Sequence, residues 1–205
     1  MSATPELDEP IDGRTARAVR TRDAIVEACL GLIDEGDLRP TGPRIAERAG
    51  VSVRSIFQHF VDLEALFGAV GEMVRVRLEP LLRRIDPAAS QDERVEAHVV
   101  QRAQVLEALS PVLRAALVHA PTSGVISDQF TGGHAFFRAQ VEEVFAAELG
   151  AAGDQEAALA QALVIATSWT TWELLRSAQG LAPEEAQRSM AWLVRAALVA
   201  ADVAA

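Results

Sequence analysis

Apolar residues recur every three to four positions along most of the chain, which is the period of a helix with one buried face. These stripes predict helices over residues 21–35, 63–81, 90–109, 111–120, 125–149, 154–179 and 183–201, with two shorter helices between residues 41 and 60. No stretch shows the strict alternation of a half-buried strand. The pattern therefore predicts an all-α fold of about nine helices.

Residues that favour helix ends support these boundaries. Gly36, Gly50 and Gly180 follow apolar stripes, and glycine most readily adopts the left-handed conformation that ends a helix. Side-chain oxygens that can accept a free backbone N–H of the first turn precede other stripes, at Thr41, Ser52, Asp62, Ser90 and Asp154. We also expect Ser110-Pro111 to start a separate helix and Gly132-Gly133 to interrupt or kink another.

The segment 41–60, TGPRIAERAGVSVRSIFQHF, contains two short helices separated by a tight turn at Gly50. Ile45 lies on the small apolar face of the first helix, and Ile56 and Phe60 form the apolar face of the second. Helices this short can bury both faces only if they cross at a steep angle over a third helix. This arrangement is the helix-turn-helix, whose second helix enters a DNA major groove.

The same residues carry a family resemblance. The pattern IAERAGVS-x-x-(S/T)-(I/L)-(F/Y)-x-x-F, followed by DLEAL, resembles the DNA-binding domain of the TetR family of bacterial transcriptional regulators. The resemblance covers about residues 15–70, and the remainder is similar only in length and helical pattern. We expect a disordered tail at 1–13, a three-helix DNA-binding domain at 14–62, and a helical effector-binding and dimerisation domain at 63–205.

Polar and exposed positions around the helix-turn-helix are the candidate DNA contacts. Arg54 can bind guanine O6 and N7 with two parallel hydrogen bonds, and Val53 can meet a thymine methyl group. Arginines at the start of the first helix suit phosphate contacts. The predicted set is Arg17, Arg20, Thr41, Arg44, Ser52, Val53, Arg54, Ser55, Phe57, Gln58 and His59.

Three positions depart from the family pattern. Leu63 stands where the family most often has a phosphate-contacting lysine, Phe57 where it usually has tyrosine, and Arg54 where it usually has a small residue. The formal net charge of −10 also opposes DNA binding. These features leave an alternative open, namely a helical small-molecule-binding or sequestering protein with a degenerate DNA-binding head.

Charge is unevenly distributed along the chain. Residues 13–60 hold eight arginines against six acidic residues, whereas residues 61–205 hold eleven arginines against nineteen acidic residues. The predicted DNA-binding segment is therefore the only basic part of the chain. Local phosphate contacts are expected, with weak long-range attraction to DNA.

The last two predicted helices suit a dimer interface. The helix at 154–179 is apolar around most of its circumference, so it must be buried on more than one side. The helix at 183–201 has an alanine-rich face that allows a close approach. We expect a homodimer through these helices, which would place two DNA-reading helices on a near-palindromic operator.

A regulator of this type also needs a site for a small-molecule effector. The predicted lining is Phe130, His134, Phe137, Trp169 and Trp172, with His98, Gln101, His119, Thr167 and Thr171 as further polar candidates. This aromatic-rich set favours a largely apolar ligand. Binding would shift the helix at 63–81 and change the spacing of the two DNA-binding heads.

Other functional classes find little support. The four histidines are scattered and Cys29 is the single cysteine, so we expect no metal site, no cofactor and no enzymatic activity. No apolar run is long enough to span a membrane, and the acidic N-terminus does not resemble a signal peptide. The sequence thus predicts a cytoplasmic, homodimeric TetR-like repressor that a small molecule releases from DNA.

Overall fold

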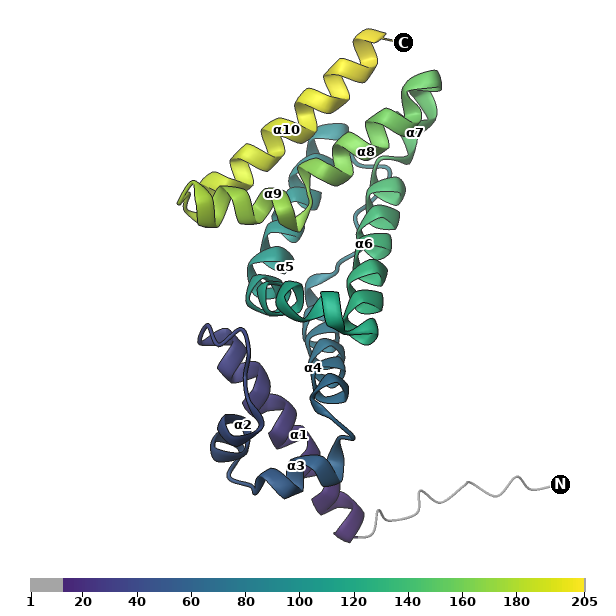
Figure 1. Cartoon of the computed structure of the whole chain (residues 1–205). Coiled ribbons are helices and arrows are strands. Elements are labelled where there is room, and N and C mark those ends of the chain that lie inside the picture. Colours follow the sequence, from purple (N-terminus) through teal and green to yellow (C-terminus); the bar gives the residue numbers. More distant parts are fainter. Residues whose placement is uncertain (1–12, 205) are drawn as a thin grey trace, which may run out of the picture.

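A computed structural model describes residues 13–204, and within that range the chain folds into ten α-helices without a strand (Figure 1). The predicted all-α fold is confirmed. A small group of helices at the N-terminal end lies below a larger helical body, and α4 connects the two (Figure 1). The tail predicted at 1–13 lies outside the described residues, apart from Gly13, the first residue of α1.

Helices α1 (Gly13–Asp34), α2 (Gly42–Ala49) and α3 (Val53–His59) form the N-terminal group. Helix α1 begins well before the predicted residue 21, because the intervening arginines and alanines favour helix and nothing there breaks it. The three helices pack around a shared core that includes Ile25, Cys29, Ile45 and Ile56. Burial raises the pKa of the Cys29 thiol to about 12, as expected for a small buried apolar residue.

All three helix starts predicted in this part of the chain hold, but only two of them have the predicted side-chain cap. Ser52 accepts the Ser55 N–H at 3.1 Å, and Asp62 accepts the Ala65 N–H at 2.8 Å. Thr41 makes no capping hydrogen bond, so that prediction is wrong.

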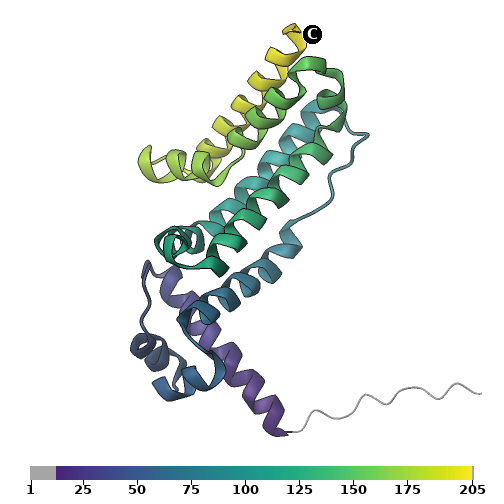
Figure 2. The same cartoon turned by 45° about the vertical axis from the view of Figure 1, so that its right-hand side comes forward.

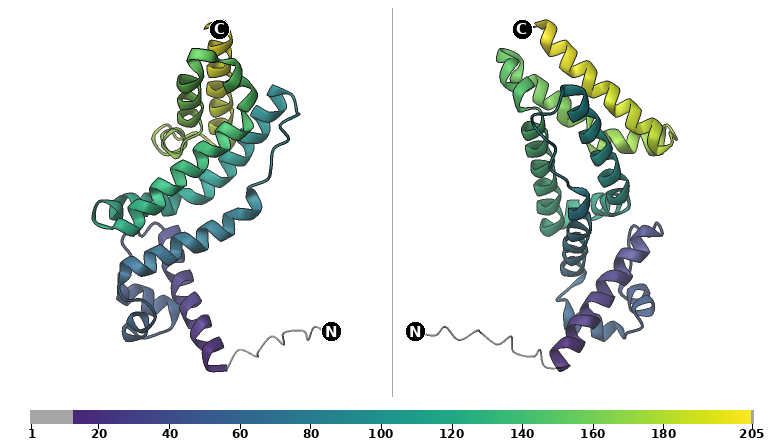
Figure 3. Two further views of the ribbon diagram at one scale, coloured as in Figure 1. Left: turned by 90° about the vertical axis from the view of Figure 1, so that its right-hand side faces the viewer. Right: turned by 180° about the vertical axis from the view of Figure 1, so that it is seen from behind.

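Helix α4 (Leu63–Leu78) joins the N-terminal group to the body (Figure 3). Its buried residues Leu66, Val70 and Val74 belong to the same core as α1, and α5 adds Val105 and Ala115 to it. The two parts of the chain therefore share packed side chains. A division at residues 62 and 63 remains a proposal.

The body consists of α5 (Gln91–His119), α6 (Gly124–Val144), α7 (Ala146–Ala151), α8 (Glu156–Ala166), α9 (Trp169–Glu173) and α10 (Pro183–Ala204). Helices α5 and α6 run side by side, and α8 and α10 pack at the end farthest from the N-terminal group (Figure 2). A second core fills this body, with Leu106, Phe145, Leu163, Trp172 and Met190 among its fully buried side chains.

Helix α5 corrects one predicted boundary. Ser110-Pro111 does not start a new helix, because α5 continues through Pro111 to His119. Proline lacks the N–H that would bond to the preceding turn. The Ser110 hydroxyl adds a hydrogen bond to the Leu106 carbonyl at 2.7 Å in the turn that precedes Pro111. The predicted start at Ser90 is confirmed, since Ser90 and Glu93 form a reciprocal capping box.

Helices α6 to α9 correct several further predictions. Helix α6 passes through Gly132-Gly133 without interruption, and the predicted helix at 125–149 breaks instead at the fully buried Phe145. The predicted helix at 154–179 breaks at Ser168, which caps α9 by accepting the Thr171 N–H at 3.2 Å. A π-helical turn at Leu174–Ala178 follows α9. Asp154 lies in a short turn before α8 and does not cap it.

A buried ion pair joins the start of α5 to α7. The Arg94 guanidinium donates from Nη1 to the Val144 carbonyl at 2.6 Å and to Glu148 Oε2 at 2.9 Å. Its hydrogen bonds hold the pKa of the Glu148 carboxyl below its usual range. Because both side chains are largely buried, this pair fixes how the two helices meet.

Candidate nucleic-acid interface and effector cavity

Helix α3 turns one face into the core and the other outward. Ile56 is fully buried, whereas Val53 and Phe57 are 38% and 50% exposed. Arg54 and Gln58 are exposed beside them, so these four residues follow one another along a single side of the helix. This face, which we call the α3 outer face, combines two apolar groups with a cation and an amide.

The N-terminal core holds the α3 outer face in place. The C-cap of α3, Phe60, is buried, and the Arg22 guanidinium of α1 lies 5.0 Å from the centre of its ring. Gly50 takes a left-handed conformation with φ of 66°, which allows the tight turn between α2 and α3. Arg22 thus packs on the residue that ends α3, a contact that its sequence position alone did not reveal.

Two arginines near α2 pair with acidic side chains of the same chain. Arg44 bonds to Asp37, although it was predicted to contact phosphate. Arg48 makes two hydrogen bonds with Glu35, at 2.6 and 2.8 Å, and these bonds hold the pKa of the Glu35 carboxyl below its usual range. The intramolecular carboxylates reduce the positive charge that α2 offers to DNA.

Other predicted DNA contacts remain exposed. Within the described residues, Arg17, Arg20 and Arg54 have no ion pair, so their charges are available to phosphates or bases. Thr41 and Ser52 are exposed at the starts of α2 and α3, while Ser55 and His59 are half-buried. The available cations therefore lie at the start of α1 and on α3.

The start of α4 is bound to the body of the protein. Leu63 is half-buried against the N-terminal core, which explains why this position carries an apolar residue. The neighbouring Glu64 accepts hydrogen bonds from the Ser123 hydroxyl at 2.6 Å and the Val125 N–H at 3.3 Å. Further along, Gln129 donates to the Gly68 carbonyl at 3.0 Å. The first turns of α4 and α6 are thus linked by direct hydrogen bonds.

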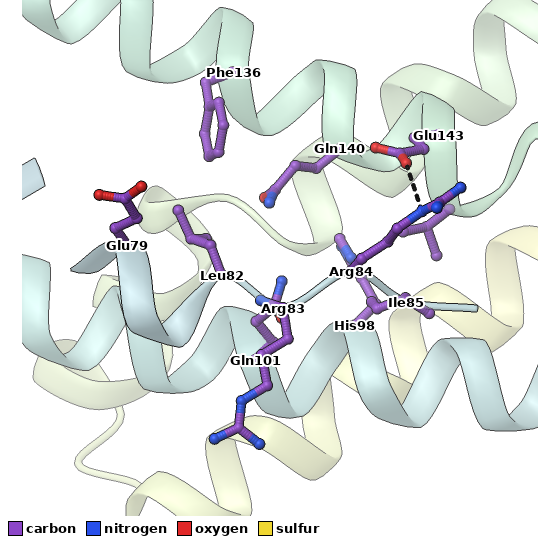
Figure 4. A pocket seen from close by; sticks show the side chains of 11 residues that line it. Glu79, Leu82, Arg83, Arg84, Ile85, His98, Gln101, Phe136, Gln140 and Glu143 are labelled. Carbon is purple, nitrogen blue, oxygen red and sulfur yellow. Dashed lines mark hydrogen bonds and ion pairs between the residues drawn. The ribbon is translucent and has the colours of Figure 1, made fainter. Parts of the chain in front are cut away.

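A cavity of about 430 Å³ lies between α5, α6 and the segment that follows α4 (Figure 4). We call it the α5–α6 cavity. Its apolar wall includes Leu82, Ile85 and Phe136, and its polar wall includes His98, Gln101 and Gln140. At its edge, Arg84 lies 4.0 Å from Glu143, and both side chains are mostly exposed.

Two buried basic groups lie at this polar wall: His98 lines the cavity, whereas Arg102 is not part of the lining. His98 is 2% exposed, and its Nε2 has no hydrogen-bond partner in the described part of the chain. Burial, reinforced by the nearby Arg102, lowers the pKa of His98 to about 3, so its ring is neutral at pH 7. Arg102 is 3% exposed, and it donates to the Phe137 carbonyl at 3.3 Å and to Gln140 Oε1 at 3.2 Å.

The structure separates the five residues predicted to bind an effector. Phe137 packs against the N-terminal core, whereas Trp169 packs against the core of the body and Trp172 belongs to it. Phe130 and His134 contact each other on α6, with their ring centres 5.0 Å apart. None of the five lines the α5–α6 cavity, but Trp172 lines a second hollow of about 480 Å³ beside α10.

Two of the polar candidates, unlike the aromatic ones, lie at the α5–α6 cavity. Of the further polar candidates, His98 and Gln101 do line the α5–α6 cavity. They lie one turn apart on α5, so helical spacing is the signal in the sequence that could have paired them. The residues facing them across the cavity come from α6 and from the segment after α4, which no local pattern connects to α5.

Comparison with known proteins agrees with this architecture. Residues 25–70 match the sequence profile described as bacterial regulatory proteins, tetR family. No curated protein sequence matches the chain.

Several solved structures share the fold. A transcriptional regulator from Rhodococcus sp. Rha1 is 19% identical with a TM-score of 0.63, over 89% of this chain and 96% of that one. A protein assigned to the TetR family from Mesorhizobium loti is 17% identical with a TM-score of 0.60, over 90% and 98%. A protein assigned as a transcriptional regulator from Pseudomonas aeruginosa is 19% identical with a TM-score of 0.63, over 93% and 97%.

The helix-turn-helix on a helical body defines the class as a transcriptional regulator with a DNA-binding N-terminal domain. Residues 25–70 carry the DNA-binding region of the TetR family of bacterial regulatory proteins, and the rest of the chain shares the fold of the solved structures. Among the described residues, no cluster of side chains suits a metal ion, and no helix is long and apolar enough to cross a membrane.

Proposed function

We propose that the protein is a homodimeric TetR-family repressor that binds a near-palindromic operator and leaves it when a small molecule binds. The observation that carries this proposal is the α3 outer face. It exposes Val53, Arg54, Phe57 and Gln58 together on a helix whose opposite side is buried. A guanidinium and an amide can read base edges, and the two apolar groups can meet thymine methyl groups.

Exposed apolar side chains on α10 support a dimer. Trp192 is 69% exposed, Val199 60% and Val203 83%, and their spacing places them along one side of the helix. The adjacent α8 contributes Ile165, which is 65% exposed. Apolar surface of this kind is typical of helix-packed homodimer interfaces. A two-fold axis through α8 and α10 would present two α3 helices to the two halves of an operator.

The α5–α6 cavity suits an effector site that acts on α4. One wall of the cavity, from Leu82 to Ile85, follows the short 3-10 turn at Glu79–Leu81 that extends α4. A ligand there would contact the segment through which α4 joins the body. The Glu64–Ser123 hydrogen bond links the other end of α4 to α6. A displacement of α6 or of this segment would therefore move α4 and, with it, the DNA-binding head.

The remaining aspects of the proposal follow from the class. A regulator of chromosomal genes works in the cytoplasm, and we propose that location. We propose no enzymatic activity and no cofactor. The chain divides functionally into a DNA-binding head at 14–62 and an effector-binding and dimerisation body at 63–205.

A fluorescence-anisotropy titration tests the proposal. DNA flanking the protein's own gene is titrated at two salt concentrations with excess non-specific competitor, and sequences selected from random DNA replace it if no site is found. Arg54→Ala should weaken the selected site by roughly 1–3 kcal/mol and relax preference at one base pair. Arg17→Ala should weaken all sequences about equally and reduce the salt dependence.

Failure of this experiment has a defined meaning. If selection from random DNA enriches no sequence, the head does not read DNA, and the protein is a helical small-molecule-binding or sequestering protein. If Arg54→Ala weakens every sequence equally, Arg54 contacts phosphate and not a base.

A further inference from the structure

The polar wall of the α5–α6 cavity presents unused hydrogen-bond donors, while the two carboxylates of the lining, Glu79 and Glu143, lie at the exposed edge. Gln101 Oε1 accepts the Arg83 N–H at 2.8 Å, and Gln140 Oε1 accepts from Arg102 at 3.2 Å. Each amide therefore uses its oxygen in a hydrogen bond within the protein, and its NH₂ group remains available as a donor to a ligand. Neither NH₂ group has a partner in the described part of the chain. The polar wall thus presents hydrogen-bond donors that can bind an acceptor group of a ligand.

His98 adds a second, independent observation. Its Nε2 is buried without a partner, and a buried polar atom left unpaired is costly. Figure 4 shows His98 and Gln101 on one side of the cavity and Gln140 on the other, with the segment after α4 between them. A neutral imidazole can present Nε2 as an N–H donor to a ligand placed there.

The buried positive charge of Arg102 favours an anionic ligand. It is buried but has no carboxylate partner among the described residues, where its contacts are two carbonyl oxygens and the face of Phe137, 4.0 Å away. Buried arginines are usually paired with an acid. The acids of the cavity, Glu79 and Glu143, lie at its exposed edge, and Glu143 is opposite Arg84. The interior therefore carries an uncompensated positive charge.

We propose that the α5–α6 cavity binds a small carboxylic acid as its carboxylate, held by the Gln140 amide and His98 Nε2 in the field of Arg102. The apolar part of the ligand would lie against Leu82 and Phe136. A cavity of about 430 Å³ is at the small end of the usual range for ligand sites, which suits roughly 10 to 20 non-hydrogen atoms. The inference deepens the proposed function and rests on its choice of this cavity.

Isothermal titration calorimetry with four probes that share one apolar body tests the ligand class. The probes are 4-phenylbutanoate, 4-phenylbutanamide, 4-phenylbutan-1-ol and 4-phenylbutylamine. The carboxylate should bind most tightly, the neutral amide and alcohol more weakly, and the ammonium not at all. Because hydrogen bonds to a charged group are stronger, the affinity for the carboxylate should exceed that for the alcohol by about tenfold to a hundredfold.

A single isosteric substitution gives the sharpest variant. Gln140→Glu places a carboxylate beside Arg102, so the protein would supply its own counter-charge and should stay folded. It should reduce the affinity for 4-phenylbutanoate at least about tenfold while leaving the alcohol within about threefold. Glu143→Gln on the same helix is the matched control, and it should keep the preference for the carboxylate. His98→Leu should weaken the carboxylate more than the alcohol.

Three results would overturn the inference: no binding of any probe, equal binding of carboxylate and ammonium, or an unchanged carboxylate affinity in Gln140→Glu. These results are distinct from failure of the proposed function. A protein that binds its operator but ignores the carboxylate refutes only the ligand class. A protein that binds the carboxylate as expected but selects no DNA refutes only the regulator.

Discussion

Replacing His98 by leucine should make the protein less sensitive to acid. The pKa of His98 is lowered from 6.5 to about 3 by burial and by Arg102. At pH values between about 3 and 6.5, His98 is protonated in the unfolded chain but neutral in the native state. The free energy of unfolding therefore decreases as the pH falls below 6.5. Above 6.5 both states are neutral at this position and the contribution vanishes.

The size of the effect follows from the shift. Each pH unit within the window is worth about 1.4 kcal/mol, so acidification from about pH 7 to about pH 4.5 should remove roughly 2.5 kcal/mol through His98 alone. The other charged groups around the cavity, namely Glu79, Arg83, Arg84, Arg102 and Glu143, are present in both proteins, and their effects cancel in the difference. Arg102 has a pKa of about 10 and stays charged throughout.

Urea denaturation followed by circular dichroism measures this difference. The free energies of unfolding of the wild type and His98→Leu are compared at both pH values and at one protein concentration, because the stability of the proposed dimer would depend on concentration. The gap between them should shift by roughly 2.5 kcal/mol in favour of the variant at the lower pH. Gln101→Leu is the control, because it removes a polar side chain of the same cavity and glutamine does not titrate. The free energy of unfolding of this variant should change with pH by the same amount as that of the wild type. A gap between wild type and His98→Leu that is the same at both pH values would refute a neutral, buried His98.

Three further substitutions test the packing. Arg94→Met leaves Glu148 buried without its partner and should lower the free energy of unfolding by about 3–5 kcal/mol. Removing both charges together should lower it by less, and urea titrations of the single and double variants test this difference. Val199→Glu should convert dimers to monomers in sedimentation experiments, and an unchanged mass would exclude this face of α10 as the interface. Ser52→Ala should cost about 1 kcal/mol of stability through loss of its cap, while Thr41→Ala, which removes no cap, should cost almost nothing; equal losses in thermal unfolding would contradict the assignment.

The sequence alone determined the helix-turn-helix and the helical class. The signals there are local: the helix face with Ile56 and Phe60, the left-handed Gly50 and the cap at Ser52 lie within a few turns of one another. Backbone preferences and short-range packing act on the same residues, so they agree. The same locality explains why the starts at Asp62 and Ser90 were predicted correctly.

The tertiary structure decided where the longer helices continue or break and which residues share a cavity. Pro111 is an unfavourable residue inside a helix, yet α5 continues through it, and Phe145 favours no break, yet α6 ends there in the buried core. The donors of the α5–α6 cavity, on α5 and α6, come together only when the helices pack. Local preferences amount to about 1 kcal/mol per residue, except for the roughly 3 kcal/mol of proline, and packing of several large side chains exceeds them. Residues far apart in the chain meet only through that packing.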